Sequence, residues 1–180
     1  IKTPEKFWLR WKEPCGEPCK PSRFTAEEYP NELDRSVLQF FEPVRLLEYI
    51  HDFIIFDGGI KKTARPNQYF AVKAAQPRVR KKQNGIIWHS QGSGKSLTMI
   101  WLARWIRENV SDARVVIITD RDELDKQIER VFTQAGEPIT RTSSGRDLMA
   151  QLAQAKPRLL CSLVHKFGIT ARQADADFEA

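Results

Sequence analysis

The chain has 180 residues, which is enough for one large domain or for one domain and part of another. Hydrophobic residues make up 41% of it, enough for a buried core, but no run approaches the roughly 18 apolar residues of a membrane span, so we expect no membrane segment. Three cysteines are an odd number, and Cys15 and Cys19 lack a second pair at zinc-site spacing. We therefore expect reduced thiols and a cytoplasmic protein.

The net charge of +6 is unevenly distributed. From Gly58 to Arg107 there is no Asp or Glu, whereas eleven bases fall in that stretch. They are Lys61, Lys62, Arg65, Lys73, Arg78, Arg80, Lys81, Lys82, Lys95, Arg104 and Arg107. Such a stretch favours a polyanionic partner, either nucleotide phosphates or nucleic acid. For Arg78–Lys82 alone, a solvated basic loop is an equally good interpretation.

The N-terminal part begins with residues 1–30, whose prolines, charges and aromatics predict an irregular linker or the tail of a preceding domain. Helical spacing of apolar residues begins at Asn31, and Pro43 ends that run and starts a second helix. Residues 53–56 are either the last turn of this helix or a short strand, and residues 57–59 form a turn. This part of the chain is therefore mainly helical.

Pro66 can begin a third helix, which we expect to be followed by a basic loop at residues 78–83 and a short buried strand at Ile86–Trp88. A glycine-bearing turn and an apolar helical pattern follow this strand. In that last helix, apolar residues at i, i+3, i+4 and i+7 predict the buried face. They are Met99, Leu102, Ala103 and Ile106.

The turn within Gly85–Ser96, GIIWHSQGSGKS, has the form of a phosphate-binding loop. Gly92 and Gly94 let several N–H groups converge on one point, and the helix that follows presents its positive end there. Lys95 would reach the β- and γ-phosphates, and the Ser96 hydroxyl would bind Mg²⁺. His89 stands where the strict pattern has its first glycine, so a chance turn is the alternative. The strand-before, helix-after context favours the phosphate loop.

Beyond this helix the order of elements predicts an α/β fold. Residues 114–119 (RVVIIT) and 158–164 (RLLCSLV) are continuous apolar strands of the kind buried in parallel sheets. Asp120 and Glu123 resemble a capping box, before a helix whose buried side we expect from four apolar residues. These are Leu124, Ile128, Val131 and Phe132. A second cap at residues 144–147 opens a further helix, so strands and helices alternate around a parallel sheet.

Hydrolysis would need an acid that holds Mg²⁺ at the end of a second strand. Asp120 follows a strand, but we expect it to cap a helix. No later apolar strand ending in Asp-Glu occurs before Ala180. The 180 residues are therefore expected to bind nucleotide without a complete hydrolytic site.

Five stretches resemble the motor (R) subunit of type I restriction enzymes, DNA translocases of helicase superfamily 2. IIWHSQGSGKSLTMIWLAR, residues 86–104, is similar to that family's phosphate loop, including its unusual histidine. The others are KKTARPNQYFAV (61–72), VVIITDRDELDKQI (115–128), CSLVHKF (161–167) and TPEKFWLRWKE (3–13). The stretch 161–167 departs from the family pattern at Cys161 and His165, where threonine is commoner.

The resemblance implies a partial RecA-like domain and specific roles for its matching residues. Gln68 matches the adenine-recognising glutamine, and an amide can both donate to and accept from adenine; a surface helical glutamine is the alternative. ATP and Mg²⁺ are implied for Gln91, Gly92, Ser93, Gly94, Lys95 and Ser96, with Lys95 and Ser96 as catalytic residues and Ser96 as the metal ligand. DNA contact is implied for Thr119, Arg121, Gln127 and Lys166, with caps and solvated helix residues as the alternative.

The same resemblance divides the chain into residues 1–30 after a nuclease domain, a lead-in at 31–84, and the first part of motor domain 1 at 85–180. It implies ATP-dependent translocation and cleavage of double-stranded DNA by the full protein, together with methyltransferase and specificity subunits. The 180 residues alone are expected to be inactive. Two alternatives remain: another superfamily 2 translocase or helicase, and a non-catalytic nucleotide-binding assembly module.

Overall fold

The computed structural model describes residues 10–13 and 23–166. The expected irregular segment 1–30 lies mostly outside these residues, as do Cys15 and Cys19. The described residues form two compact units. The first runs to Ile55 and continues with Lys61–Leu102; the second contains Phe56–Ile60 and the residues from Ala103 onward. No helix in the described ranges is long and apolar enough to cross a membrane.

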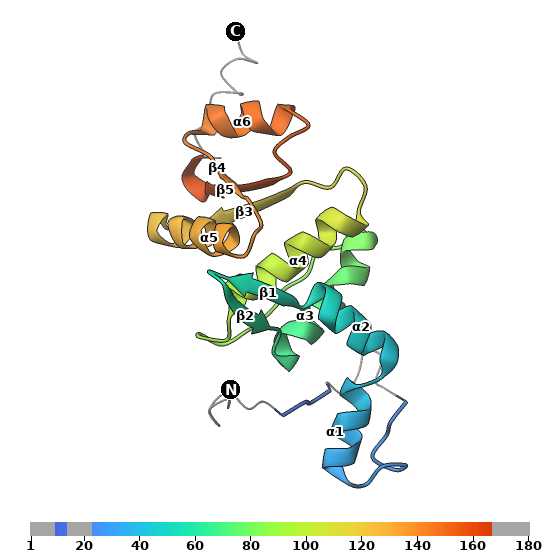
Figure 1. The fold of residues 1–180 in the computed structure, drawn as a ribbon. Coiled ribbons are helices and arrows are strands. Elements are labelled where there is room, and N and C mark those ends of the chain that lie inside the picture. The colour runs from blue at the N-terminus through green and yellow to red at the C-terminus, as the bar shows by residue number, and fades with distance from the viewer. Residues whose placement is uncertain (1–9, 14–22, 167–180) are drawn as a thin grey trace. The chain divides into compact units, whose positions relative to one another are not determined.

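The first unit is mainly helical, as expected (Figure 1). Helix α1 (Glu32–Phe40) is capped by Asn31, whose Oδ1 accepts a hydrogen bond from the N–H of Leu33 at 3.0 Å. Helix α2 (Pro43–Asp52) has its proline at the first position, where no N–H is needed. Both predicted helix starts are therefore confirmed.

For residues 53–56 we expected either a last helical turn or a short strand, and the structure shows the strand. Phe53 ends α2, and strand β1 (Ile54–Asp57) pairs with β2 (Ile60–Thr63) in a two-stranded sheet. Gly58 and Gly59, both at positive φ (57° and 83°), form the turn between the strands. Two such residues in a two-residue turn match the twist of a hairpin.

Helix α3 (Pro66–Arg80) begins at Pro66 as predicted, but it extends into the segment that we expected to be a loop. Arg78 and Arg80 lie in its last turn, so the predicted loop at 78–83 is wrong for residues 78–80. Cations near the carboxyl end of a helix are favoured by its dipole. A basic run is therefore compatible with a helix end as well as with a loop.

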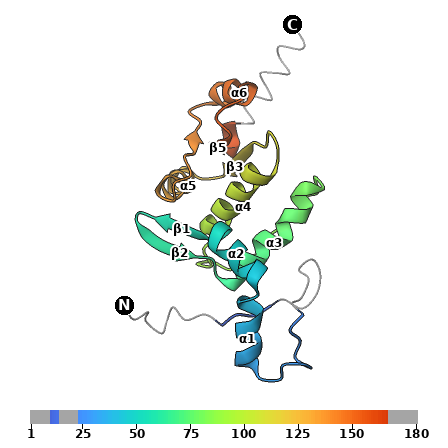
Figure 2. The same cartoon turned by 45° about the vertical axis from the view of Figure 1, so that its right-hand side comes forward.

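The core of the first unit is aromatic and joins α1, α2, α3 and α4 (Lys95–Asn109). Phe53 is fully buried, and its ring centroid lies 4.7 Å from that of Tyr69 and 6.4 Å from that of Trp101. Trp11 lies edge-on to Phe40 at 5.0 Å. Glu48 links α2 to α3, which Figure 2 shows beside it, by accepting from Tyr69 and Lys73.

Two details of the predicted phosphate-loop region are wrong. Residues 86–88 form no strand, and Ile86 and Trp88 are 89% and 91% exposed. A strand needs neighbouring backbone to pair its N–H and C=O groups, and no described strand pairs with this segment. In α4, Ala103 is buried as expected, but Met99 is 40% exposed and Leu102 and Ile106 are only half-buried. The other buried apolar residues of this helix are Ile100, Trp101 and Trp105. This helix is apolar nearly all round, so periodicity did not identify its buried face.

The second unit contains the predicted parallel sheet, flanked by helices (Figure 1). The strand order is β3 (Val115–Thr119), β5 (Leu159–Leu163) and β4 (Thr140–Arg141), with all neighbours parallel. All five residues of β5 are buried, as expected for a central strand. The two-residue β4 was not predicted. The α/β parallel architecture is confirmed and is that of a partial RecA-like domain.

Helix α5 (Asp122–Gln134) begins one residue later than a capping box from Asp120 requires. Arg121 occupies the cap position and makes no side-chain cap hydrogen bond, so that predicted cap is wrong. Three acids in the first turn complement the helix dipole instead. Ile128 and Phe132 are buried as expected, whereas Leu124 is 39% exposed and Val131 is only half-buried.

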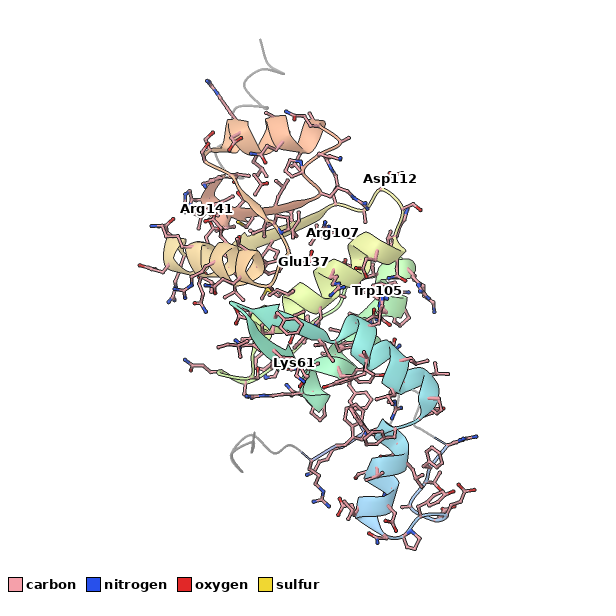
Figure 3. All side chains as sticks on the ribbon, in the orientation of Figure 1. Lys61, Trp105, Arg107, Asp112, Glu137 and Arg141 are labelled. Atoms are coloured by element: carbon pink, nitrogen blue, oxygen red, sulfur yellow. The ribbon has the colours of Figure 1, made fainter. Side chains whose placement is uncertain are left out.

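The predicted cap of α6 (Gly145–Ala153) is confirmed. Ser144 Oγ accepts a hydrogen bond from the N–H of Asp147 at 3.1 Å, and Asp147 Oδ2 accepts one from the N–H of Ser143 at 2.7 Å. The latter bond is the main reason that the pKa of Asp147 is lowered. Elsewhere in this unit, Arg107 pairs with Glu137 at 2.5 Å (Figure 3).

Candidate nucleotide-binding site

The segment His89–Ser96 forms a tight loop that leads directly into α4. Gly92 and Gly94 have φ values of 75° and 81°, a conformation that favours glycine. Ser93 closes the turn by donating from its N–H and its Oγ to the carbonyl of Ser90, at 3.4 and 2.7 Å. The loop therefore has the conformation that the glycine spacing predicts.

The loop presents backbone donors at the amino end of a 15-residue helix. Among the hydrogen bonds of the described residues, none uses the N–H of Gly94, Lys95 or Ser96 as donor. The partial positive charge of a helix N-terminus adds to these groups. A phosphate placed here would receive several N–H bonds at once.

Lys95 lies across the loop. Its Nζ donates to the carbonyls of His89 and Ser90 at 3.2 and 2.9 Å, and the residue is solvent-exposed. Neutral carbonyls are weaker partners for an ammonium group than phosphate oxygens are. His89 Nδ1, in the same loop, is buried and has no hydrogen-bond partner, so a second polar atom of the loop could still form a hydrogen bond.

Gln68 on α3 contacts the same loop and is 2% exposed. Its Oε1 accepts from the N–H of Arg65 at 2.8 Å, and its Nε2 donates to the carbonyls of Ser93 and Gly94 at 3.2 and 3.0 Å. The resemblance paired this glutamine with the phosphate loop only through a shared ligand. The direct contact spans 25 residues of sequence and was not predicted.

Replacing Gly94 with alanine is expected to disrupt the loop more than replacing Gly92. A Cβ on Gly94 would lie 2.4 Å from Gln68 Nε2, and Gln68 could move away only by breaking its hydrogen bonds. A Cβ on Gly92 meets nothing within 4 Å, so that variant bears only the strain of positive φ, about 1–2 kcal/mol.

The measurement for this pair is thermal unfolding followed by circular dichroism, with nucleotide affinity as a second readout. We expect a lower melting temperature and weaker binding for Gly94→Ala than for Gly92→Ala. Equal losses in the two variants would contradict the proposed steric role of Gln68.

The oxygen that the phosphate-loop pattern offers to a metal is the hydroxyl of Ser96, which is half-buried. The described residues contain no group of three or more His, Cys, Asp or Glu that could hold a metal ion. Mg²⁺ commonly takes one or two protein ligands and completes its shell with phosphate oxygens and water. The donor set thus fits a metal that arrives with a nucleotide. Gln91 is exposed at the loop's start.

The four predicted DNA-contact residues lie in the second unit and differ in exposure. Arg121 has 77% of its side chain exposed, and its Nε lies 3.6 Å from Asp120 Oδ2. Gln127 is also exposed. Thr119 is buried and donates to Asp125 Oδ1 at 3.4 Å. Lys166 is 8% exposed and donates to the carbonyl of Thr142. Only the first two present side chains to solvent.

An ion pair of the buried Asp125, beside Thr119, was not predicted from the sequence. Asp125 is fully buried and accepts from Arg141 Nε at 2.5 Å. This hydrogen bond is the main cause of a raised pKa at Arg141. Burial, followed by the charge of Asp125, raises the pKa of Cys161 to about 12. The available signal was an acid three residues before Ile128, on the buried face of α5.

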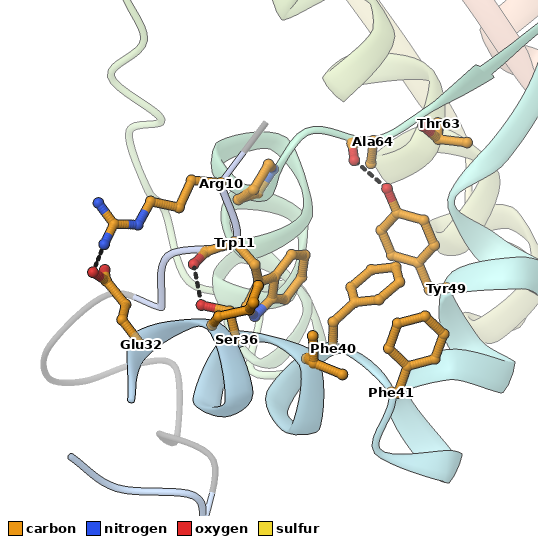
Figure 4. A pocket seen from close by; sticks show the side chains of 12 residues that line it. Arg10, Trp11, Glu32, Ser36, Phe40, Phe41, Tyr49, Thr63 and Ala64 are labelled. Atoms are coloured by element: carbon orange, nitrogen blue, oxygen red, sulfur yellow. Dashed lines mark hydrogen bonds and ion pairs between the residues drawn. The ribbon is translucent and has the colours of Figure 1, made fainter. Parts of the chain in front are cut away.

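A pocket of roughly 630 Å³ in the first unit was also missed. Figure 4 shows aromatic rings of α1 and α2 along one side and the segment around Ala64 along another. Trp11 and Tyr49 line it, and Tyr49 donates to the carbonyl of Ala64. The rings come from the segment 10–13 and from two helices, so no local sequence pattern predicts the pocket.

A partial RecA-like parallel sheet, together with a glycine loop, a lysine and a serine at a helix start, defines the class of phosphate-loop nucleotide-binding proteins. Residues 67–179, more than half of the chain, match the family model of the SWI2/SNF2 ATPases. The chain therefore belongs to the SWI2/SNF2 ATPase family. Membership implies use of ATP.

Individual relatives show which enzymes the chain resembles. The chain is 31% identical over 148 residues, 76% of its length, to a Methanocaldococcus jannaschii protein provisionally named the endonuclease subunit of type I restriction enzyme MjaIXP. It is 31% identical over 140 residues, 70% of its length, to the type I restriction enzyme HindI endonuclease subunit of Haemophilus influenzae. The chain spans 14% and 12% of the lengths of these relatives. The resemblance drawn from the five stretches is thus confirmed.

Proposed function

We propose that the chain is the ATP-binding part of the DNA-translocating subunit of a type I restriction enzyme. The observation that carries this proposal is the loop at Gln91–Ser96, which places free N–H groups, Lys95 and Ser96 at the start of α4. The similarity to endonuclease subunits of such enzymes supports it. ATP-dependent translocation and cleavage of DNA are proposed for the whole protein, of which this chain would form a small part.

In this proposal the triphosphate lies on the N–H groups of Gly94, Lys95 and Ser96. Lys95 exchanges the carbonyls of His89 and Ser90 for β- and γ-phosphate oxygens, because the charged partner is the stronger one. The hydroxyl of Ser96 holds Mg²⁺, which neutralises phosphate charge when bound. Gln91 at the loop's start completes the phosphate-binding set. The family resemblance assigns Gln68 to adenine recognition, although both ends of its amide already have protein partners.

The proposed DNA contacts divide according to exposure. In this proposal Arg121 and Gln127 contact the DNA backbone directly, which the exposure of both side chains supports. Thr119 and Lys166 would act from behind that surface, through Asp125 and the carbonyl of Thr142.

In this proposal the partners are double-stranded DNA and the methyltransferase and specificity subunits, in the cytoplasm. Residues 31–84 serve as the lead-in and 85–180 as the beginning of the motor domain.

Calorimetric titration of the chain with ATP and with adenosine, each in the presence of Mg²⁺, tests this function. We expect ATP to bind and adenosine to bind far more weakly, because the polar groups of the loop would bind phosphates, which adenosine lacks. Absence of ATP binding at millimolar concentration would contradict the proposal. Equal affinity for adenosine and ATP would contradict the assignment of the loop.

A further inference from the structure

Gln68 has its side-chain amide engaged at both ends. The residue is 2% exposed, its Oε1 holds the N–H of Arg65, and its Nε2 donates to the carbonyls of Ser93 and Gly94. A primary amide has two donor hydrogens, so these two carbonyls use both. The side chain therefore links the first turn of α3 to the phosphate loop.

The two carbonyls differ in how they are held. The Gly94 carbonyl also accepts from the N–H groups of Leu97 and Thr98, at 3.1 and 3.2 Å, so the helix itself orients it. In the described residues the Ser93 carbonyl accepts from Gln68 alone. Gln68 is thus the group that fixes the orientation of the Ser93–Gly94 peptide.

The orientation of that peptide determines where a phosphate donor points. In a planar trans peptide, the carbonyl of one residue and the N–H of the next point in opposite directions. With the Ser93 carbonyl turned toward Gln68, the N–H of Gly94 is turned away from it. That N–H, like those of Lys95 and Ser96, is a backbone N–H of the loop that donates no hydrogen bond within the described residues.

We propose that Gln68 is a positioning residue of the phosphate loop, which orients the Gly94 N–H for any bound polyphosphate, whatever base the nucleotide carries. The close approach of its amide is possible because residue 94 has no Cβ, which would lie 2.4 Å from Nε2. The consequence for affinity rests on the proposed ATP-binding function, whereas the effect on the ligand-free loop does not. A purely adenine-recognising glutamine would leave the loop unaffected.

The test is Gln68→Glu, which keeps the shape and the acceptor for Arg65 but replaces both donor hydrogens with an oxygen facing two carbonyls. The first readout is the ¹H–¹⁵N spectrum of the ligand-free chain, where we expect the Gly94 amide signal to shift. The second is calorimetry with ATP, GTP and inorganic tripolyphosphate. We expect every ligand that binds the wild-type chain to weaken by the same factor, about tenfold, with the ratio of ATP to GTP affinity unchanged.

Gln76→Glu is the matched control, because it places the same substitution at another buried position of α3, where Nε2 has no hydrogen-bond partner. It should leave the Gly94 signal in place. If Gln68→Glu does not fold, Gln68→Met removes the same donors without adding charge and should shift the same signal. An unshifted Gly94 signal, or a loss confined to ATP with tripolyphosphate unchanged, would overturn the positioning role. A wild-type chain that binds no polyphosphate would overturn the proposed function, whatever the Gly94 signal shows.

Discussion

Replacing Lys95 with alanine is expected to raise the dissociation constant for Mg·ATP about 10- to 150-fold. This is the effect of losing a charged hydrogen-bond donor, worth about 1.5–3 kcal/mol. The fold should survive, since Lys95 is exposed and its partners are two carbonyls of its own loop. Calorimetric titration of the wild type and the variant with ATP measures the change directly.

Lys73→Ala is the matched control for this prediction. Lys73 belongs to the same acid-free stretch and the same compact unit, but its Nζ pairs with Glu48 at 2.5 Å. Its removal should leave ATP affinity nearly unchanged. If both variants lost affinity equally, binding would depend on the diffuse positive charge of the stretch rather than on the loop. If Lys95→Ala bound ATP like the wild type, the loop would not be the site.

Local signals account for the elements that were predicted correctly. Asn31, Pro43 and Pro66 mark helix starts through their own side chains, and β3 and β5 are continuous apolar runs between helices. The segment at Ile86–Trp88 has the same apolar character but is not a strand. A strand depends on hydrogen bonds to a neighbouring backbone, and the sequence of the segment itself does not specify that neighbour.

The candidate site shows the same division between local and distant information. The glycines, Lys95 and Ser96 occupy adjacent positions, so their spacing alone predicts the loop and the helix start. The contact of Gln68 with Ser93 joins residues 25 apart, and that of Arg141 with Asp125 joins residues 16 apart. Neither follows from periodicity, because each depends on how separate helices and strands pack.

Replacing Asp125 with alanine is expected to lower the free energy of unfolding by about 1.5–3 kcal/mol, the contribution of a hydrogen bond to a charged group, because Arg141 is only half-buried and keeps Asp122 as a second partner. Asp125 is fully buried, and it accepts from Arg141 Nε and from Thr119 Oγ1. Removing its carboxylate leaves the buried hydroxyl without its acceptor and deprives the guanidinium of its buried partner. Urea unfolding followed by circular dichroism gives the change in free energy.

Asp122→Ala is the natural comparison, because Asp122 pairs with the same Arg141 but has 48% of its side chain exposed. A solvent-exposed ion pair contributes little, so this variant should lose much less stability than Asp125→Ala. Combining Asp125→Ala with Arg141→Met removes both charges and should recover part of the loss. Equal losses for Asp122→Ala and Asp125→Ala would mean that burial of Asp125 does not determine the effect. A double variant no more stable than Asp125→Ala would place the cost in the cavity and the Thr119 hydroxyl rather than in the guanidinium that has lost its buried partner.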